Sequence, residues 1–256
     1  VTRGGPQNFL LNNLLRFPQA KSANAIYGTL IHAVLQHAHS HLAASGTRKP
    51  IEDITGEFIR LLHQQNLSDA DLALYSKRGI EALEAFLGAK YDTFKSSQKP
   101  ELSFTGQGVV LGQARLTGSL DLVDIDNQTI TVTDYKTGKP STSWTGKSDY
   151  EKIKLHKYRQ QLMFYELLCA NSRDYAKYDF GGAILQFVEP DSRGDIYQLD
   201  DRFSRDELAD FQHLIAAVWR CITTLELPDI SSYQASYQGM IQFEKDLISN
   251  KYLARE

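Results

Sequence analysis

The sequence predicts an α/β protein, because a helical block, a group of β-patterned runs and a second set of helices follow one another along the chain. In the first part, apolar side chains recur at helical spacing. In the second, runs rich in Val, Ile, Leu, Thr and Phe meet at glycines. We expect one domain over residues 1–256, made of a helical cover (1–97), a core (98–200) and C-terminal helices (201–256).

The helical cover is predicted from periodicity and capping. The apolar residues after Gly28, from Leu30 to Leu35, have helical spacing. A second helix is expected over Ile51–Gln65, and a third begins after Ser68 and runs to about Phe94. The block ends at Lys99-Pro100.

The core is predicted as strands. Three antiparallel strands are expected at Glu101–Leu111, Ala114–Ile125 and Thr129–Tyr135. Two further strands are expected at Gly181–Val188 and Ile196–Leu199. A tight turn at Asp126-Asn127 joins two of them in a hairpin. The run at Gly181–Val188 is almost wholly apolar, which predicts a central strand.

Three long helices complete the expected elements. The first covers Tyr150–Asn171. The second begins at Ser204, where Glu207 completes a capping box, and continues to about Thr224. The last covers Gln238–Ser249.

Composition narrows the class of protein. The net charge is −3, so a nucleic-acid partner requires a local basic face. The cysteines are Cys169 and Cys221, too few for an iron–sulfur cluster within this chain. No apolar run approaches the length of a membrane span, and we expect a cytoplasmic protein without a membrane partner. The start at Val1 suggests a part of a longer protein.

Two carboxylates and an ammonium meet at one end of the predicted sheet. Asp121 lies on one strand of the hairpin, and Asp134 and Lys136 lie at the end of the other. We expect both aspartates and the backbone carbonyl of Tyr135 to bind a divalent cation. Lys136 would orient the attacking water or offset charge in the transition state. This chemistry suits hydrolysis of a phosphodiester.

Three further features support this interpretation. His32 lies on an apolar helical stripe, where a metal or a carboxylate would satisfy its imidazole. Gln161 and Tyr165 share a helical face and can hydrogen-bond a phosphate. The segment from Tyr135 to Gln160 has seven cations and two anions, a local charge of +5 that would attract a nucleic-acid backbone. Its expected DNA contacts are Lys139, Lys154, Lys157 and Arg159, and its Trp144 and Tyr158 would stack on bases.

Together these residues resemble the PD-(D/E)XK nuclease superfamily, in its RecB-like branch. The matching pieces are GTLIH with His32, Glu101 on the first strand, GSLD with Asp121, DYKTGK with Asp134 and Lys136, and Q-x-x-x-Y at Gln161 and Tyr165. The start of the chain also looks like the C-terminal nuclease domain of UvrD/Rep-type helicases. Several such relatives carry four cysteines for an iron–sulfur cluster, which this chain lacks.

The resemblance implies a mixed central β-sheet flanked by helices, the restriction-endonuclease-like core, and a DNase dependent on Mg²⁺ or Mn²⁺. By that likeness His32, Asp121 and Asp134 bind metal, Lys136 is catalytic, and Gln161 and Tyr165 guide DNA at the site edge. Glu101 matches a position that is often acidic in the family, and its role stays open.

The resemblance also implies partners: DNA that is single-stranded or has free ends, and helicase domains in a repair or recombination protein. The main alternative is an inactive module that binds single-stranded DNA. A zinc-binding structural protein built on His37, His39 and His41 is a third possibility.

Overall fold

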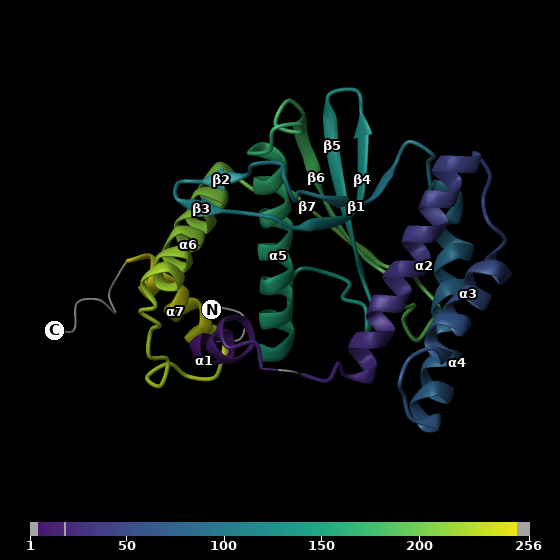
Figure 1. Ribbon diagram of the computed structural model, residues 1–256, viewed down its shortest axis with the longest axis horizontal. Helices are drawn as coiled ribbons and strands as arrows, with labels where there is room; N and C mark the ends of the chain where they lie inside the picture. The colour runs from purple at the N-terminus through teal and green to yellow at the C-terminus, as the bar shows by residue number, and fades with distance from the viewer. Residues whose placement is uncertain (1–4, 18, 250–256) are drawn as a thin grey trace.

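The computed structural model describes residues 5–17 and 19–249. A mixed five-stranded sheet lies between two helical layers (Figure 1). One layer is formed by α2, α3 and α4, and the other by α5, with α6 and α7 beyond it. This arrangement confirms the predicted α/β fold with a helical N-terminal part. None of the described helices has the length and apolar content to cross a membrane.

The helical cover consists of α2 (Ala23–Ser45), α3 (Ile51–His63) and α4 (Asp69–Lys90), followed by a 3₁₀ turn, η2 (Tyr91–Thr93). Before them lie α1 (Gly5–Phe9) and a π-helical turn, η1 (Leu10–Leu14). Ser68 caps α4 as expected, because its hydroxyl accepts a hydrogen bond from the amide of Asp71. α4 ends earlier than predicted, since Arg48 binds the carbonyls that follow it.

The sheet has the order β1-β4-β5-β6-β7. Its strands are β1 (Lys99–Ser103), β4 (Ser119–Asp126), β5 (Thr129–Lys136), β6 (Asp179–Phe187) and β7 (Gln198–Asp201). β5 pairs with β6 in parallel, and the other neighbouring pairs are antiparallel. The helix α5 (Asp149–Ala170) connects the two parallel strands.

Three strand predictions require correction. The runs Glu101–Leu111 and Ala114–Ile125 are not continuous strands, because the small hairpin of β2 (Val110–Leu111) and β3 (Ala114–Arg115) leaves the main sheet. Gly108 precedes this hairpin and Gly112 lies in its turn, and both have the positive φ that these bends require. The strand at Gly181–Val188 is interior but not central, since β5 occupies the middle of the sheet.

The C-terminal helices are α6 (Arg205–Thr224) and α7 (Tyr237–Ile248). The predicted capping box of Ser204 and Glu207 is present, and Ser148 and Glu151 form a second one at the start of α5. Both cysteines are buried.

Each face of the sheet has its own core. Leu122, Tyr135 and Val188 join the cluster of the helical cover. Leu120, Val123 and other strand residues join a second cluster with α5. α6 and α7 share a third, smaller cluster.

The helices α3 and α4 approach closely at Gly79. A Cβ there would lie 2.1 Å from Cε1 of the fully buried Phe58. Gly79→Ala should therefore lower the free energy of unfolding by about 1–3 kcal/mol through overpacking, despite the better helix propensity of Ala. Gly88→Ala, on the same helix in open space, should raise it by up to about 1 kcal/mol. Denaturant unfolding of both variants checks the contact, and equal effects would contradict it.

Glu166 on α5 provides a test by pH. Its Oε2 is buried without a hydrogen-bond partner among the described residues, and burial raises the pKa of its carboxyl to about 7. Between pH 4.5 and 7 the folded state then holds more protons than the unfolded state, so stability falls as pH rises through this window. Glu166→Gln should be more stable than the parent at pH 8, by on the order of 1 kcal/mol for this solvent-screened group, and equally stable at pH 4.

Thermal unfolding across that range measures the difference. Glu84→Gln, at an exposed position on α4, is the matched control and should follow the parent at every pH. A constant offset between Glu166→Gln and the parent would contradict the titration.

Candidate active site

The site begins where β4 and β5 separate. Their pairing extends from Asp126 and Thr129 to Leu122 and Thr133, and it ends there. Beyond that point the amide of Tyr135 donates to Oδ2 of Asp121, at 2.9 Å, instead of to a backbone carbonyl. The carboxylate thus satisfies a backbone group and is fixed at the mouth of the gap.

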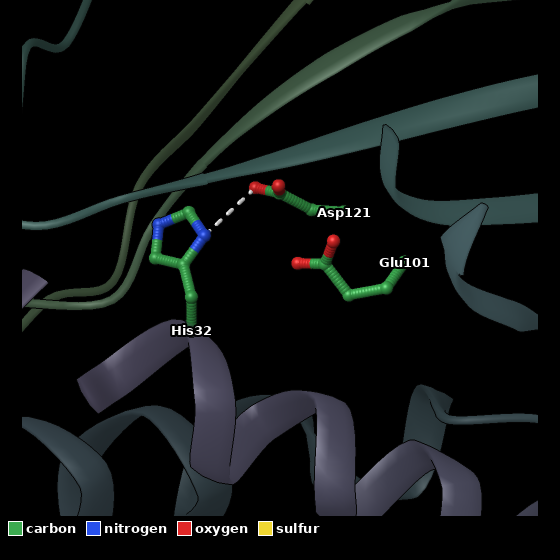
Figure 2. A group of neighbouring side chains, drawn as sticks. All are labelled: His32, Glu101 and Asp121. Carbon is green, nitrogen blue, oxygen red and sulfur yellow. Dashed lines mark ion pairs between the residues drawn. The ribbon is translucent and has the colours of Figure 1, made fainter. Parts of the chain in front are cut away.

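Asp121 lies beside His32 and Glu101 (Figure 2). Nδ1 of His32, on α2, is 3.2 Å from Oδ2 of Asp121. One ligand atom from each of these three residues lies within 4.8 Å of the others. The group therefore joins the helical cover to two strands of the sheet.

The backbone turns Glu101 toward this group. Its φ is +48°, in the left-handed region that a glutamate rarely adopts within a strand. It faces Asp121 between the paired residues Pro100–Leu122 and Leu102–Leu120. Strain of this kind, on the order of 1–3 kcal/mol, persists where the surroundings enforce it and is common at functional sites.

Asp134 and Lys136 form a second group on the other face of β5. Nζ of Lys136 is 2.6 Å from Oδ2 of Asp134, whose side chain is 1 % exposed. Tyr165 donates from its hydroxyl, and Gln161 from Nε2, to Oδ1 of the same carboxylate, both at 2.8 Å. Oε1 of Gln161 accepts from Lys136 at 2.9 Å.

These partners act together. The four side chains orient one another, so the lysine and the aspartate cannot turn outward independently.

The carboxyl groups are electrostatically crowded. Burial, and next the charge of Asp121, raise the pKa of Glu101. Burial raises the pKa of Asp134, with Lys136 opposing this effect and Asp121 adding to it. Burial opposes protonation of His32, but the hydrogen bond and charge of Asp121 outweigh it, so the pKa of the imidazole is raised. A bound cation would relieve the repulsion among these acids.

The donor set fits a divalent cation. His32, Glu101 and Asp121 offer two carboxylates and one imidazole. Oδ2 of Asp134 is buried and, among the described residues, lacks a donor in hydrogen-bond geometry, although the ammonium of Lys136 neutralises it. Oxygen-rich sites of this kind suit Mg²⁺ or Mn²⁺.

The resemblance implied that Asp134 binds metal with His32 and Asp121. The structure gathers Glu101 with those two residues, and the charge of Asp134 also acts on His32. Asp134 is held by residues of α5 and by Lys136. The signal for Glu101 was its acidic character on the first strand, but nothing in the sequence indicated its left-handed backbone.

The expected basic residues do not share one surface. Lys139 is exposed, and its carbonyl accepts from Nζ of Lys154 at 3.3 Å. Lys157 lies one helical turn from Lys154, whereas Arg159 faces away and pairs with Asp201 and Glu207. Arg159 is thus neutralised within the protein, and its expected contact with DNA stays a prediction.

The three histidines proposed for zinc do not converge. His37 binds Glu57, and Nε2 of His39 contacts the hydroxyl of Tyr135 at 2.8 Å. His39 is buried and stacks on Phe94, with ring centroids 3.8 Å apart. Burial lowers the pKa of this imidazole to about 4, so it is neutral at pH 7. It supports Tyr135, the residue whose amide fixes Asp121.

A polar link also joins the cover to the loop after Lys136. Arg78 on α4 donates from Nε and Nη2 to the two oxygens of Glu189, at 2.9 and 2.8 Å. Glu189 also accepts from the amide of Gly138 at 2.5 Å. The guanidinium packs over the ring of Tyr27, 4.6 Å from its centroid. The loop that begins the basic segment is thereby held against α2 and α4.

The comparison with protein families agrees with this geometry. The chain matches the model of the PD-(D/E)XK nuclease superfamily over residues 4–234, and it belongs to that superfamily. Nucleases of this superfamily act on nucleic acids and use divalent metals. No curated protein matches the chain.

The contact between His39 and Tyr135 can be tested by a double-mutant cycle. Tyr135→Phe leaves Nε2 of His39 buried without a partner, so it should lower the free energy of unfolding by about 1–3 kcal/mol. His39→Leu in the same chain should recover part of this loss, because both polar groups are then absent. Denaturant unfolding of the single and double variants measures the coupling, and strictly additive losses would contradict it.

Proposed function

We propose that the protein is a metal-dependent deoxyribonuclease that hydrolyses phosphodiester bonds. One observation carries the proposal: His32, Glu101 and Asp121 lie together, and the charges of the buried pair of Asp134 and Lys136 act on the same imidazole. Carboxylates that hold a divalent cation, next to an oriented ammonium, are what hydrolysis of a phosphodiester requires.

In this mechanism His32, Glu101 and Asp121 would hold the cation, and Asp134 and the carbonyl of Tyr135 are further candidate ligands. The cation, when bound, neutralises the scissile phosphate and makes a water nucleophilic. Mg²⁺ and Mn²⁺ are both consistent with these donors, and one ion or two would fit the proposal.

Lys136 would orient the water or offset negative charge as it develops on the phosphate. Its ammonium is fixed by Asp134 and Gln161, so little reorganisation is needed during the reaction. Tyr165 is 5 % exposed and bound to Asp134, which favours a role in positioning the carboxylate over direct contact with DNA. Gln161 is less buried and lies at the edge of the site.

We further propose that the chain belongs to the RecB-like branch and serves as the nuclease part of a helicase–nuclease in DNA repair or recombination, in the cytoplasm. The supporting features are the order of the GTLIH, GSLD, DYKTGK and Q-x-x-x-Y motifs along one chain. The exposed Lys139 and the neighbouring Lys154 would attract the DNA backbone.

The alternative is a module with this fold that binds single-stranded DNA without cutting it. Sequences of such modules usually lose an acid or the lysine, whereas Asp121, Asp134 and Lys136 are all present here. The two functions differ in one observable, which is cleavage that depends on a divalent metal.

The test is cleavage of plasmid and of labelled single-stranded and duplex oligonucleotides with Mg²⁺, Mn²⁺ or EDTA. We expect cutting with either metal and none with EDTA. Asp121→Ala, Asp134→Ala and Lys136→Ala should each reduce the rate at least a hundredfold, because each removes a metal ligand or a charge that stabilises the transition state. Glu101→Gln should mainly raise the metal concentration needed for half-maximal rate.

Unfolding curves of the same variants control for loss of structure. Lys77→Gln, on the exposed surface of α4, should retain the parent rate. DNA binding without metal-dependent cutting by the parent chain would favour the binding module instead, and parental rates in the Asp121 or Lys136 variants would refute the mechanism.

A further inference from the structure

One face of α5 carries a stripe of aromatic and polar side chains that ends at the candidate active site. Its members are spaced so that they share a helical face: Tyr150, Lys154, Tyr158, Gln161 and Tyr165. Exposure decreases along the stripe, from 76 % at Tyr150 to 5 % at Tyr165. The outer end therefore presents an aromatic ring to solvent, and the inner end reaches Asp134.

The members of the stripe contact one another and the catalytic candidates. Nζ of Lys136 lies 4.9 Å from the ring centroid of Tyr158, and Nζ of Lys154 lies 5.8 Å from the same centroid. Lys154 also donates to the carbonyl of Lys139, which brings the loop after β5 alongside the helix. Aromatic rings thus alternate with ammonium groups from the solvent to Lys136.

The charge of this face is suited to a polyanion. No acidic residue stands among the five members of the stripe. The nearby Glu151 accepts from the amides of Lys147 and Ser148 in the capping box, and Asp149 accepts from the amide of Tyr237. Arg159, on the opposite face of the helix, pairs with Asp201 and Glu207. The charge of Glu151 acts on Lys154 at the border of this face, but the same carboxylate is held by two backbone amides, and Lys139 adds a further positive charge beside Lys154.

We propose that this stripe is a binding track for an unpaired DNA strand, which it leads to Lys136. The proposal rests on the proposed function and names its substrate as single-stranded. Bases would stack on the exposed ring of Tyr150 and on Tyr158, and phosphates would pair with Lys154 and Lys139. From Tyr150 to Gln161 the helix rises about 16 Å, a length that several nucleotides can span.

An unpaired strand fits the stripe better than a duplex does. A base can stack on a tyrosine ring only when it is free of its neighbours, and in a duplex the bases are already stacked. A duplex would offer the lysines its phosphates but would leave the ring of Tyr150 without a partner. The aromatic members therefore decide between the two substrates, and the cationic members do not.

The test is fluorescence anisotropy of labelled oligothymidylate and of a labelled duplex, with the whole chain in EDTA so that no strand is cut. Tyr150→Ala should weaken binding of the single strand about tenfold, the effect of losing one stacked base, and should leave duplex binding unchanged. Tyr150→Phe should retain the parent affinity, because the ring remains. Leu74→Ala, which shortens a side chain that is 58 % exposed on α4, is the matched control and should bind as the parent does.

The contribution of Lys154 is tested by the salt dependence of DNA affinity. Lys154→Gln should reduce the slope of log affinity against log salt by about 0.7 for the single strand, because one phosphate contact is lost. Lys77→Gln, on the exposed surface of α4, should leave the slope unchanged.

Equal single-strand affinity of the parent and Tyr150→Ala, equal losses for both substrates, or no single-strand binding by the parent would each overturn the track. Cleavage assays on the same preparations separate this inference from the nuclease itself. If the parent chain cuts DNA in a metal-dependent way and Tyr150→Ala binds the single strand as tightly as the parent, the track is refuted and the nuclease is not. Lost affinity without any cutting by the parent chain refutes the nuclease and supports the track.

Discussion

The separation of β4 from β5 after the Leu122–Thr133 pair is the constraint on which the site depends. An amide at the end of a strand must find an acceptor, and the amide of Tyr135 finds the carboxylate of Asp121. Near this point the side chains of β4 are divided between the two faces of the sheet without regular alternation. Leu122 packs toward the helical cover, whereas Leu120 and Val123 pack toward α5. The break in pairing thus creates the space and places the acid within it.

The electrostatic consequence is a concentration of negative charge that the protein only partly balances. Lys136 neutralises Asp134, and the hydrogen bonds of Tyr165 and Gln161 support that pair. Glu101 and Asp121 have His32 as their neighbour, which is a weaker counter-charge. Neighbouring carboxyl groups with raised pKa values are typical of sites that bind a cation, whose charge offsets their mutual repulsion.

Periodicity and capping predicted most of the elements. Ser68, Ser204 and the turn at Asp126-Asn127 are where the sequence placed them, because local hydrogen bonds decide these positions. The small hairpin of β2 and β3 was missed, since its apolar residues read as continuations of longer strands. Whether a short apolar run joins the main sheet depends on distant packing, and β3 lies against α6.

For the site, the sequence placed Asp134 and Lys136 together at the end of β5, where the structure joins them in an ion pair. It did not show that Asp121 lies with His32 and Glu101, because the left-handed backbone of Glu101 and the packing of α2 against the sheet leave no local signal in the sequence. The supporting role of His39 was also hidden, since its partner is 96 residues away in the chain.

The pair of Arg78 and Glu189 has a consequence for the order in which the site is assembled. His32 comes from the helical cover and the carboxylates come from the sheet, so the ligand set is divided between two layers. Arg78 and Glu189 join these layers without the help of an ion, and Gly138 is held by the same carboxylate. The spacing of the donors is therefore established by folding. The ligand set is therefore preorganised, and little of the binding free energy of a cation is used to bring the two layers together.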